Sequence, residues 1–136
     1  MIDFQLDDRS GVATYLQLAL QVRHALRLGL LRPGDKLPTA KEVVAKLAIN
    51  PNTVLKAYRE LEREGLVGAR PGQGTFVLKT LSHNDPAEQT ELRQRLAHWV
   101  VSARRAGLVD EDIDAIYHTV MRSNLDHIGG LNDTRA

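Results

Sequence analysis

The sequence predicts a mostly helical α+β protein with an N-terminal domain at residues 1–81 and a two-helix region at residues 82–136. Three observations predict this fold class. Apolar residues recur at helical spacing up to residue 65, two short β-like runs then flank a glycine-rich turn, and helical spacing returns after a break at residues 81–86. A chain of 136 residues has room for one domain, or for a small domain with an appendage.

The first helix is expected from residue 14 to about residue 31. Its apolar face follows the i, i+3, i+4, i+7 spacing and consists of Tyr15, Leu18, Ala19, Val22, Ala25, Leu26 and Gly29. Pro33 and Gly34 are expected to end this helix. Residues 35–38 are too short and too rich in turn formers for more than a bridge or a very short strand.

A short second helix is expected to follow Thr39. Thr39 and Glu42 have the spacing of a capping box, in which each side chain bonds to the backbone N–H of the other residue. The apolar face of this helix consists of Val43, Val44 and Leu47, and Ala48-Ile49 forms a tight connection to the next helix.

The third helix is expected at residues 51–64. Asn50 is a favourable N-cap, Pro51 suits the first helical position, and Gly65 stands where a left-handed C-terminal cap belongs. The inward stripe consists of Val54, Ala57, Tyr58 and Leu61. Two helices joined by about three residues, the second opening with exposed polar side chains, are typical of a helix-turn-helix.

A β-hairpin is expected directly after the third helix. The first β-like run is Leu66-Val67, and the second covers residues 75–78. Between them, residues 70–74 contain Pro-Gly and Gly-x-Gly, which favour a hairpin turn. A hairpin after a helix-turn-helix indicates a winged helix-turn-helix for residues 1–81.

The C-terminal region is expected to contain two helices and a frayed tail at residues 126–136. The first of these helices ends near Gly107 and is marked by Leu92, Leu96, Trp99, Val100 and Ala103. Asp110 is expected to cap the second, whose apolar face is Ile113, Ile116, Tyr117, Val120 and Met121.

The composition excludes several classes of function. The chain has no cysteine, so it has no disulfide framework, no thiolate nucleophile and no cysteine-ligated metal. No apolar run approaches the roughly 18 residues of a membrane span, and the N-terminus does not resemble a signal peptide. We therefore expect a cytoplasmic protein without a membrane partner.

The charge is polarised along the chain although its formal net value is only +1. Residues 1–81 contain 12 basic and 8 acidic side chains, a net charge of +4. Residues 82–136 contain 6 basic and 9 acidic side chains, a net charge of −3. This polarity is expected when one end of a protein faces phosphate groups and the other end faces a partner subunit.

The start of the third helix is the first candidate binding site. Backbone N–H groups and the helix dipole favour a phosphate there, and short polar side chains can reach base edges in a major groove. Asn52 and Thr53 suit base contacts, whereas Lys56 and Arg59 suit phosphate or guanine. The alternative is that Asn50 and Thr53 are helix caps and that Lys56 and Arg59 form a solvated face.

The hairpin tip strengthens the nucleic-acid interpretation. Arg70, Gly72, Gln73 and Gly74 combine one cation with glycines that allow the backbone to approach a phosphate or minor groove closely. An ordinary hairpin turn is the alternative for this segment considered alone.

From Tyr15 to Leu78 the chain resembles the DNA-binding domain of the GntR family of bacterial transcription regulators. Three stretches carry the resemblance, namely residues 31–38 (LRPGDKLP), 61–67 (LEREGLV) and 72–77 (GQGTFV). Residues 50–58 (NPNTVLKAY) and the short C-terminal region are similar to the YtrA-like subfamily. That resemblance implies a homodimer, paired through the C-terminal helices, that binds operator DNA as a repressor, with ABC transporter genes as targets.

The resemblance also implies roles for particular positions. The family's second-helix cation, most often arginine, corresponds to Lys41, and its wing glycine corresponds to Gly72. Pro51 and Leu55 replace arginines that are common in the family, so the contacts of those arginines do not transfer. The expected DNA-binding residues are Thr39, Lys41, Asn50, Asn52, Thr53, Lys56, Arg59, Arg70, Gly72, Gln73, Gly74 and Thr75.

The C-terminal helices have more apolar surface than a short helix pair can bury alone. We expect this surface to pack against a second subunit, and folding back onto the chain's own first helix is the alternative. The expected dimer residues are Leu92, Leu96, Trp99, Val100, Ile113, Tyr117, Val120 and Met121.

No cofactor, metal or catalytic group is expected. His118 follows Asp114 by one helical turn, but the region is too short to enclose a metal site, and the acids at 110–114 suit a helix N-terminus. No nucleophile–base grouping, P-loop or dinucleotide motif is present. A winged-helix module that binds protein instead of DNA is the main alternative function, an enzyme is a distant third, and no effector is assigned.

Overall fold

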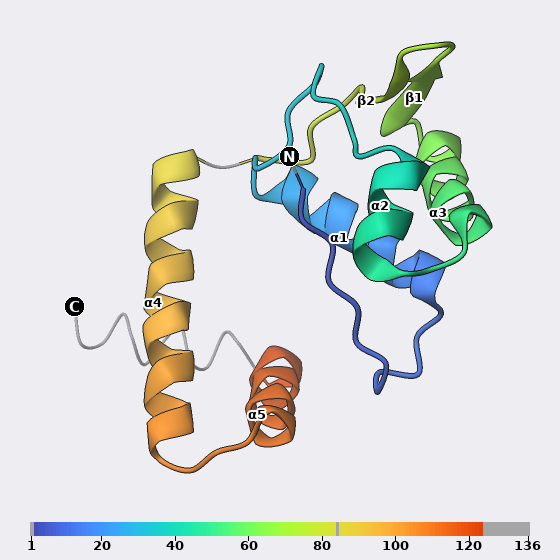
Figure 1. Cartoon of the computed structure of the whole chain (residues 1–136). Helices are drawn as coiled ribbons and strands as arrows, with labels where there is room; N and C mark the ends of the chain where they lie inside the picture. Colours follow the sequence, from blue (N-terminus) through green and yellow to red (C-terminus); the bar gives the residue numbers. More distant parts are fainter. Residues whose placement is uncertain (1, 84, 124–136) are drawn as a thin grey trace. The chain divides into compact units, whose positions relative to one another are not determined.

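The computed structural model describes residues 2–83 and 85–123 and divides into two compact units after Pro86. The first unit contains three helices and a hairpin, and the second contains two helices (Figure 1). The elements in chain order are α1 (Thr14–Arg27), α2 (Ala40–Leu47), α3 (Pro51–Arg63), β1 (Val67–Arg70), β2 (Gly74–Val77), α4 (Pro86–Arg105) and α5 (Asp110–Arg122). The predicted mostly helical α+β class and the winged helix-turn-helix are confirmed.

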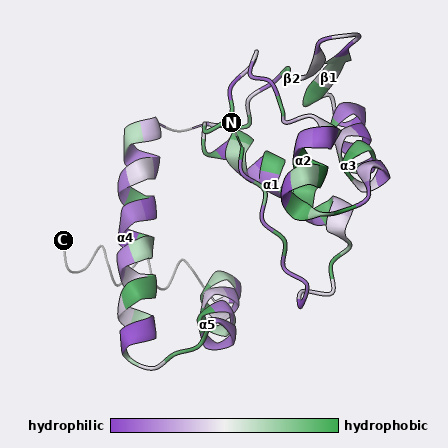
Figure 2. Ribbon diagram, viewed as in Figure 1, coloured by the Kyte–Doolittle hydropathy of each residue, from purple (hydrophilic) through white to green (hydrophobic). Residues whose placement is uncertain are grey.

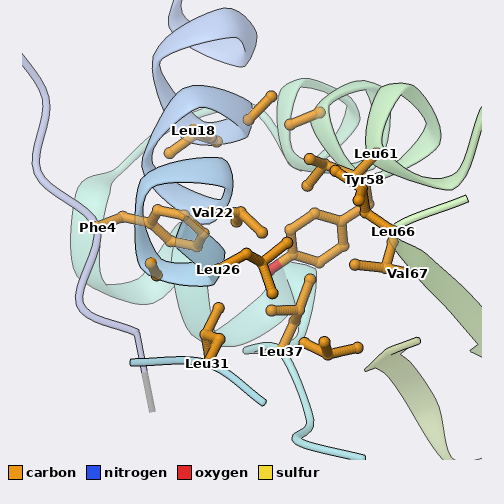
Figure 3. Packing of buried hydrophobic residues seen from close by; sticks show 14 of the residues in the cluster. Phe4, Leu18, Val22, Leu26, Leu31, Leu37, Tyr58, Leu61, Leu66 and Val67 are labelled. Carbon is orange, nitrogen blue, oxygen red and sulfur yellow. The ribbon is translucent and has the colours of Figure 1, made fainter. Parts of the chain in front are cut away.

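The core of the first unit lies between α1, α3 and the hairpin, with Tyr58 at its centre (Figure 3). The predicted inward stripe of α3 is buried throughout, as is most of the predicted face of α1. Burial of about ten large apolar side chains, at roughly 1.5–3 kcal/mol each, is the main stabilising contribution. The largest fully buried side chains are Leu18, Leu26, Leu37, Leu61, Val22, Val54, Val67 and Val77.

The N-terminal segment also joins this core, a position that no pattern in the sequence predicted. Phe4 is buried against the helices, and the backbone N–H of Gln5 donates to the side-chain oxygen of Gln21 at 2.9 Å. Asp3 forms an ion pair with Lys46 of α2. The segment therefore connects α1 with α2 along one side of the unit.

Helix α1 ends at Arg27, about four residues before its predicted end. Gly29 has a φ of +71°, and the N–H groups of Leu30 and Leu31 both return to the carbonyl of Ala25, at 2.9 and 3.2 Å. Glycine adopts this left-handed conformation without a Cβ clash, so it ends the helix before Pro33 can. The turn places Leu31 in the core.

The predicted caps of α2 and α3 are confirmed. The Thr39 hydroxyl oxygen accepts from the Glu42 N–H at 3.1 Å, and the Asn50 side chain accepts from the Asn52 N–H at 2.8 Å. Gly65, with a φ of +75°, ends α3 as predicted. The predicted cap of α5 is wrong by one residue. Val109 is the N-cap, and its N–H donates to the carboxylate of Asp112 at 3.0 Å.

Residues 34–37 pair with the free edge of β2 and widen the two-stranded hairpin. In the hairpin, Arg70 lies opposite Gly74 and Gly68 lies opposite Phe76. Lys36 lies opposite Phe76 on the other side, where the Val77 N–H donates to the Asp35 carbonyl at 2.8 Å. The predicted bridge is therefore a short pairing segment that attaches the hairpin to the rest of the unit.

A buried hydrogen bond links α3 to the start of α2. The hydroxyl of Tyr58 donates to the carbonyl of Pro38 at 2.6 Å. Burial raises the pKa of this hydroxyl above its ordinary value of 10, and the negative charge of Glu42 acts in the same direction. The hydroxyl is therefore protonated, and available as a donor, across the physiological pH range.

Within the described ranges, no helix has both the length and the apolar character that crossing a lipid bilayer requires.

Replacing Tyr58 by phenylalanine tests the contribution of this bond. Tyr58→Phe leaves the Pro38 carbonyl buried without its partner, so the free energy of unfolding should fall by about 1–3 kcal/mol. Urea denaturation measures this change. Tyr15→Phe is the control, and it should change the free energy by no more than about 0.5 kcal/mol. Equal stability of the Tyr58→Phe variant and the parent protein would contradict this role.

Candidate nucleic-acid interface

The first turn of α3 presents the predicted base-reading residues. Asn52 is exposed and Thr53 is half-buried, and both lie directly after the capped N-terminus of the helix. The turn before them requires Ala48 in a left-handed conformation, with a φ of +55°, which closes the angle between α2 and α3. The free N–H groups and the dipole of α3 therefore point out of the protein beside two short polar side chains.

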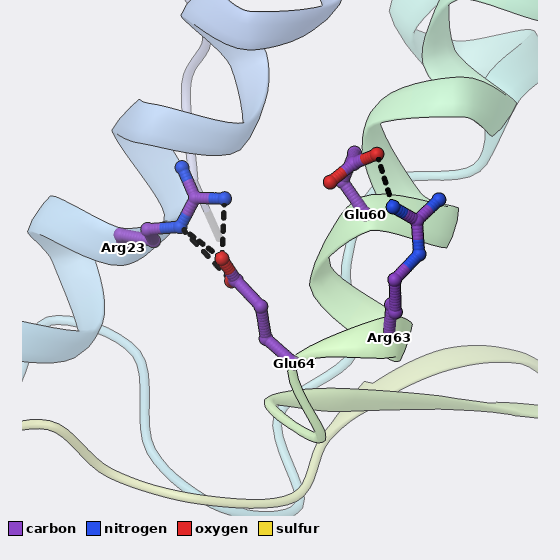
Figure 4. A network of polar contacts seen from close by, with 4 residues as sticks. All are labelled: Arg23, Glu60, Arg63 and Glu64. Atoms are coloured by element: carbon purple, nitrogen blue, oxygen red, sulfur yellow. Dashed lines mark hydrogen bonds and ion pairs between the residues drawn. The ribbon is translucent and has the colours of Figure 1, made fainter.

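The orientation of α3 is fixed by its buried face and by an ion pair at its end. Val54, Ala57 and Leu61 have no exposed surface, which turns Lys56 and Arg59 outward. At the C-terminal end, the guanidinium of Arg23 in α1 bonds both carboxylate oxygens of Glu64, at 2.7 and 2.9 Å (Figure 4).

The bond to Glu64 raises the pKa of Arg23, although partial burial opposes the rise. The bidentate geometry gives this pair more directional strength than a single-point contact. Glu60 and Arg63 form a second ion pair on α3, with the Nη1 atom of Arg63 lying 3.0 Å from the Oε1 atom of Glu60 (Figure 4).

Lys56 has a contact that the sequence did not predict. Its ammonium nitrogen lies 4.1 Å from the ring centroid of Tyr15 in α1, a cation–π distance. The two residues are far apart in the chain, so no local pattern could have indicated the pair. The contact restricts the side chain while leaving its charge without a carboxylate partner among the described residues.

The wing holds its cation by a similar contact. The guanidinium carbon of Arg70 lies 4.2 Å from the ring centroid of Phe76 on the neighbouring strand. At the tip, Gly72 has a φ of +74° and open space around it, and Gln73 is exposed. The tip is thus accessible, while the arginine behind it is held in place.

The remaining predicted DNA-binding residues lie at the edges of this surface. Lys41 is exposed near the start of α2, and Thr39 is half-buried with its hydroxyl engaged in the capping box. Thr75 is half-buried in β2, and its carbonyl accepts from Leu37. Figure 1 shows α2, α3 and the hairpin side by side, so the structure brings these residues into one region of the first unit.

The predicted dimer residues lie in the second unit and leave much apolar surface uncovered. Ala103 is the one buried residue among those described in α4 and α5. Figure 2 shows hydrophobic residues interleaved with hydrophilic ones along both helices. Val100 and Ile113 are half-buried. The other six predicted dimer residues are exposed, with exposed fractions from 39% at Trp99 to 60% at Leu92; these residues are Leu92, Leu96, Trp99, Tyr117, Val120 and Met121.

The histidine and acid noted in α5 form a local contact. The Nδ1 atom of His118 lies 2.8 Å from the carbonyl oxygen and 3.5 Å from the carboxylate of Asp114. The described residues contain no group of three or more side chains suited to hold a metal ion.

Comparison with known proteins identifies a family for the first unit and relatives that match over most of the chain. Residues 14–77, which comprise the helix-turn-helix and the wing, match the family described as "Bacterial regulatory proteins, gntR family". The chain is 32% identical to the HTH-type transcriptional repressor YtrA of Bacillus subtilis, and the match covers 93% of this chain and 95% of that protein. The chain belongs to the GntR family.

Other members of the GntR family match over most of this chain as well. The HTH-type transcriptional regulator YhcF of Bacillus subtilis is 36% identical over 77% of this chain and 87% of its own length. The solved structure of YtrA from Sulfolobus acidocaldarius, titled a GntR-family transcription factor, is 29% identical with a TM-score of 0.51, covering 89% of this chain and 99% of that one. This GntR-family chain is a DNA-binding transcription regulator and not an enzyme.

Proposed function

We propose that two copies of this chain bind one inverted-repeat operator, inserting α3 of each copy into successive major grooves and acting as a repressor. The observation that carries the proposal is the orientation of α3. One face is buried in the core, and the other presents Asn52, Lys56 and Arg59 to solvent behind a capped N-terminus. A helix held in this way can enter a groove without reorganisation.

The exposed residues divide by chemistry into two roles. The Asn52 amide can bond adenine at two points, and Thr53 can bond a base or contact a thymine methyl group. Lys41, Lys56 and Arg70 are cations suited to phosphates, and Gly72 at the tip allows close approach of the backbone. Asn50 contributes by holding the first turn of α3 through its bond to the Asn52 N–H.

Exposed Leu55 adds an apolar contact at this surface. It stands on α3 next to the base-reading turn, and a side chain of this kind suits a thymine methyl group. The preferred operator is therefore expected to contain A·T pairs where α3 contacts each half-site.

Dimerisation through α4 and α5 would cover the exposed apolar surface. It would also compensate for the weak DNA binding expected of a single first unit. A net charge of +4 over residues 1–81 favours only modest binding by one copy. Joining two copies makes the second contact effectively intramolecular and raises the overall affinity without new contacts.

The regulatory direction and the targets are drawn from relatives. The Bacillus relative with nearly full coverage is named a repressor, which supports the same role for this chain. The resemblance to the YtrA-like subfamily points to genes of ABC transporters as the targets.

Two substitutions separate base reading from phosphate binding. Asn52→Ala should reduce the preference for the operator over a scrambled duplex by about tenfold, because one base contact is worth roughly 1–3 kcal/mol. Arg70→Ala should weaken binding to both duplexes and lower the salt slope by about 1. Fluorescence anisotropy with both duplexes between 50 and 200 mM salt measures these changes.

Glu62→Ala, at the far end of α3, is the matched control and should leave the preference unchanged. An Asn52→Ala variant with unaltered affinity and preference would refute the base-reading role. Binding that does not depend on salt would favour a protein-binding module instead.

The dimer is tested by placing a charge in the apolar surface. Leu96→Glu should convert a dimer to a monomer at micromolar concentration and weaken operator binding, because an unpaired charge would be buried between subunits. Analytical ultracentrifugation measures the mass. Gln94→Glu on the other side of α4 is the control and should remain dimeric. A monomeric parent protein at the same concentration would reject the dimer.

A further inference from the structure

Lys36 lies on the wing although it is remote from the hairpin in sequence. Its backbone position is fixed by the segment that pairs with β2, where the Leu37 N–H donates to the Thr75 carbonyl at 2.9 Å and Lys36 itself lies opposite Phe76. Lys36 is exposed. The turn that precedes it in the chain contains Gly34, whose N–H donates to the Val77 carbonyl at 2.8 Å. Lys36 is thus part of a three-segment sheet.

The sheet register puts Lys36 on the same face as Arg70. Residues directly opposite in an antiparallel pair share a face, and so do residues two apart along a strand. Lys36 and Phe76 are opposite one another, as are Gly74 and Arg70, and Phe76 follows Gly74 by two residues. Val67 and Val77 on the alternate face are buried, so the face with the two cations points to solvent.

The two cationic side chains extend in opposite directions along this face. Arg70 reaches toward Phe76, and its guanidinium lies over the ring. Lys36 reaches toward Gly74, and a Cβ added to that glycine would lie only 2.7 Å from its Cε atom. The missing side chain at Gly74 therefore leaves the space in which the stem of Lys36 lies.

Neither cation has an acidic partner among the described residues. No ion pair of Lys36 or Arg70 occurs among the residues that the structure describes, whereas Arg23, Lys46, Arg63, Arg95 and Arg104 each have an acidic partner. The Arg70 guanidinium lies over the Phe76 ring instead, and the stem of Lys36 lies in the space that Gly74 leaves. Such a pair of positioned, uncompensated charges suits an anion that approaches from outside.

We propose that Lys36 binds a DNA phosphate together with Arg70, so that the outer face of the wing is a two-cation phosphate site. This inference rests on the proposed DNA binding. Lysine acts as a point charge toward phosphate, and Arg70 adds a planar donor set to the same face. Gly74 has a positioning role, because it leaves room for the lysine stem.

The test measures the slope of log Kobs against log salt for the full-length chain on operator DNA. Lys36→Met keeps the unbranched stem over Gly74 and removes only the charge. Loss of one phosphate contact should make the slope less steep by about 0.9. Between 50 and 200 mM salt, the affinity of the variant should therefore fall by a factor about threefold smaller than that of the parent protein. Lys36→Ala should lower the slope equally, and Arg70→Ala should lower it by a similar amount.

Lys79→Met is the matched control, because Lys79 is an exposed lysine near Gly65, at the other end of the hairpin. Its slope should equal that of the parent protein. A parental slope in Lys36→Met would overturn the inference, and so would a loss seen in Lys36→Ala but not in Lys36→Met, which would assign Lys36 a packing role. In both cases the salt-dependent binding of the parent protein would stand. Failure of the parent protein to bind would instead refute the proposed function and this inference with it.

Discussion

The burial of one face of α3 is the constraint on which the rest of the structure depends. Val54, Ala57 and Leu61 have no exposed surface, so the helix has one orientation in which its apolar stripe is covered. The remaining face must point to solvent, and this face carries Asn52 and Lys56. The same packing makes the Tyr58 hydroxyl reach the Pro38 carbonyl. That bond ties α3 to the start of α2 and to the segment that supports the wing. A change in the buried stripe would therefore displace α2, α3 and the wing, the three parts of the proposed DNA-binding surface, together.

Positive charges on this surface are held by neutral contacts, whereas several structural cations are held by acids. Lys56 lies over Tyr15 and Arg70 over Phe76, but Arg23 is bonded to Glu64. An aromatic ring restricts a cationic side chain without cancelling its charge, which preserves the charge for a phosphate. The ion pair with Glu64 instead joins α1 to the C-terminal end of α3. This division explains how a unit with a modest net charge can still concentrate usable charge on one surface. The helical region at the C-terminus, with its negative net charge, carries the exposed apolar residues for which we propose a second copy as partner.

Local patterns predicted most of this architecture, because helix faces, caps and turns depend on neighbouring residues. The capping box at Thr39, the N-cap at Asn50 and the stop at Gly65 are of this kind. The early end of α1 was missed because Gly29 fits both an apolar helix face and a left-handed stop. Phe4 in the core, Lys56 over Tyr15 and Lys36 over Gly74 all join distant segments, and no periodicity encodes such pairs. For the candidate site, the sequence could name residue types and the surface. It could not show which cations were held, or by which contacts.

Selection of bound sequences from a random duplex library by the full-length chain tests the central claim most directly. A dimer that inserts two α3 helices into successive major grooves must select an inverted repeat. The centres of the half-sites should be about 10 bp apart, or a multiple of that spacing, because both helices approach one side of the duplex. Enrichment of such a repeat would support the paired use of α3. Enrichment of a single unrepeated site, or of no sequence at all, would contradict it.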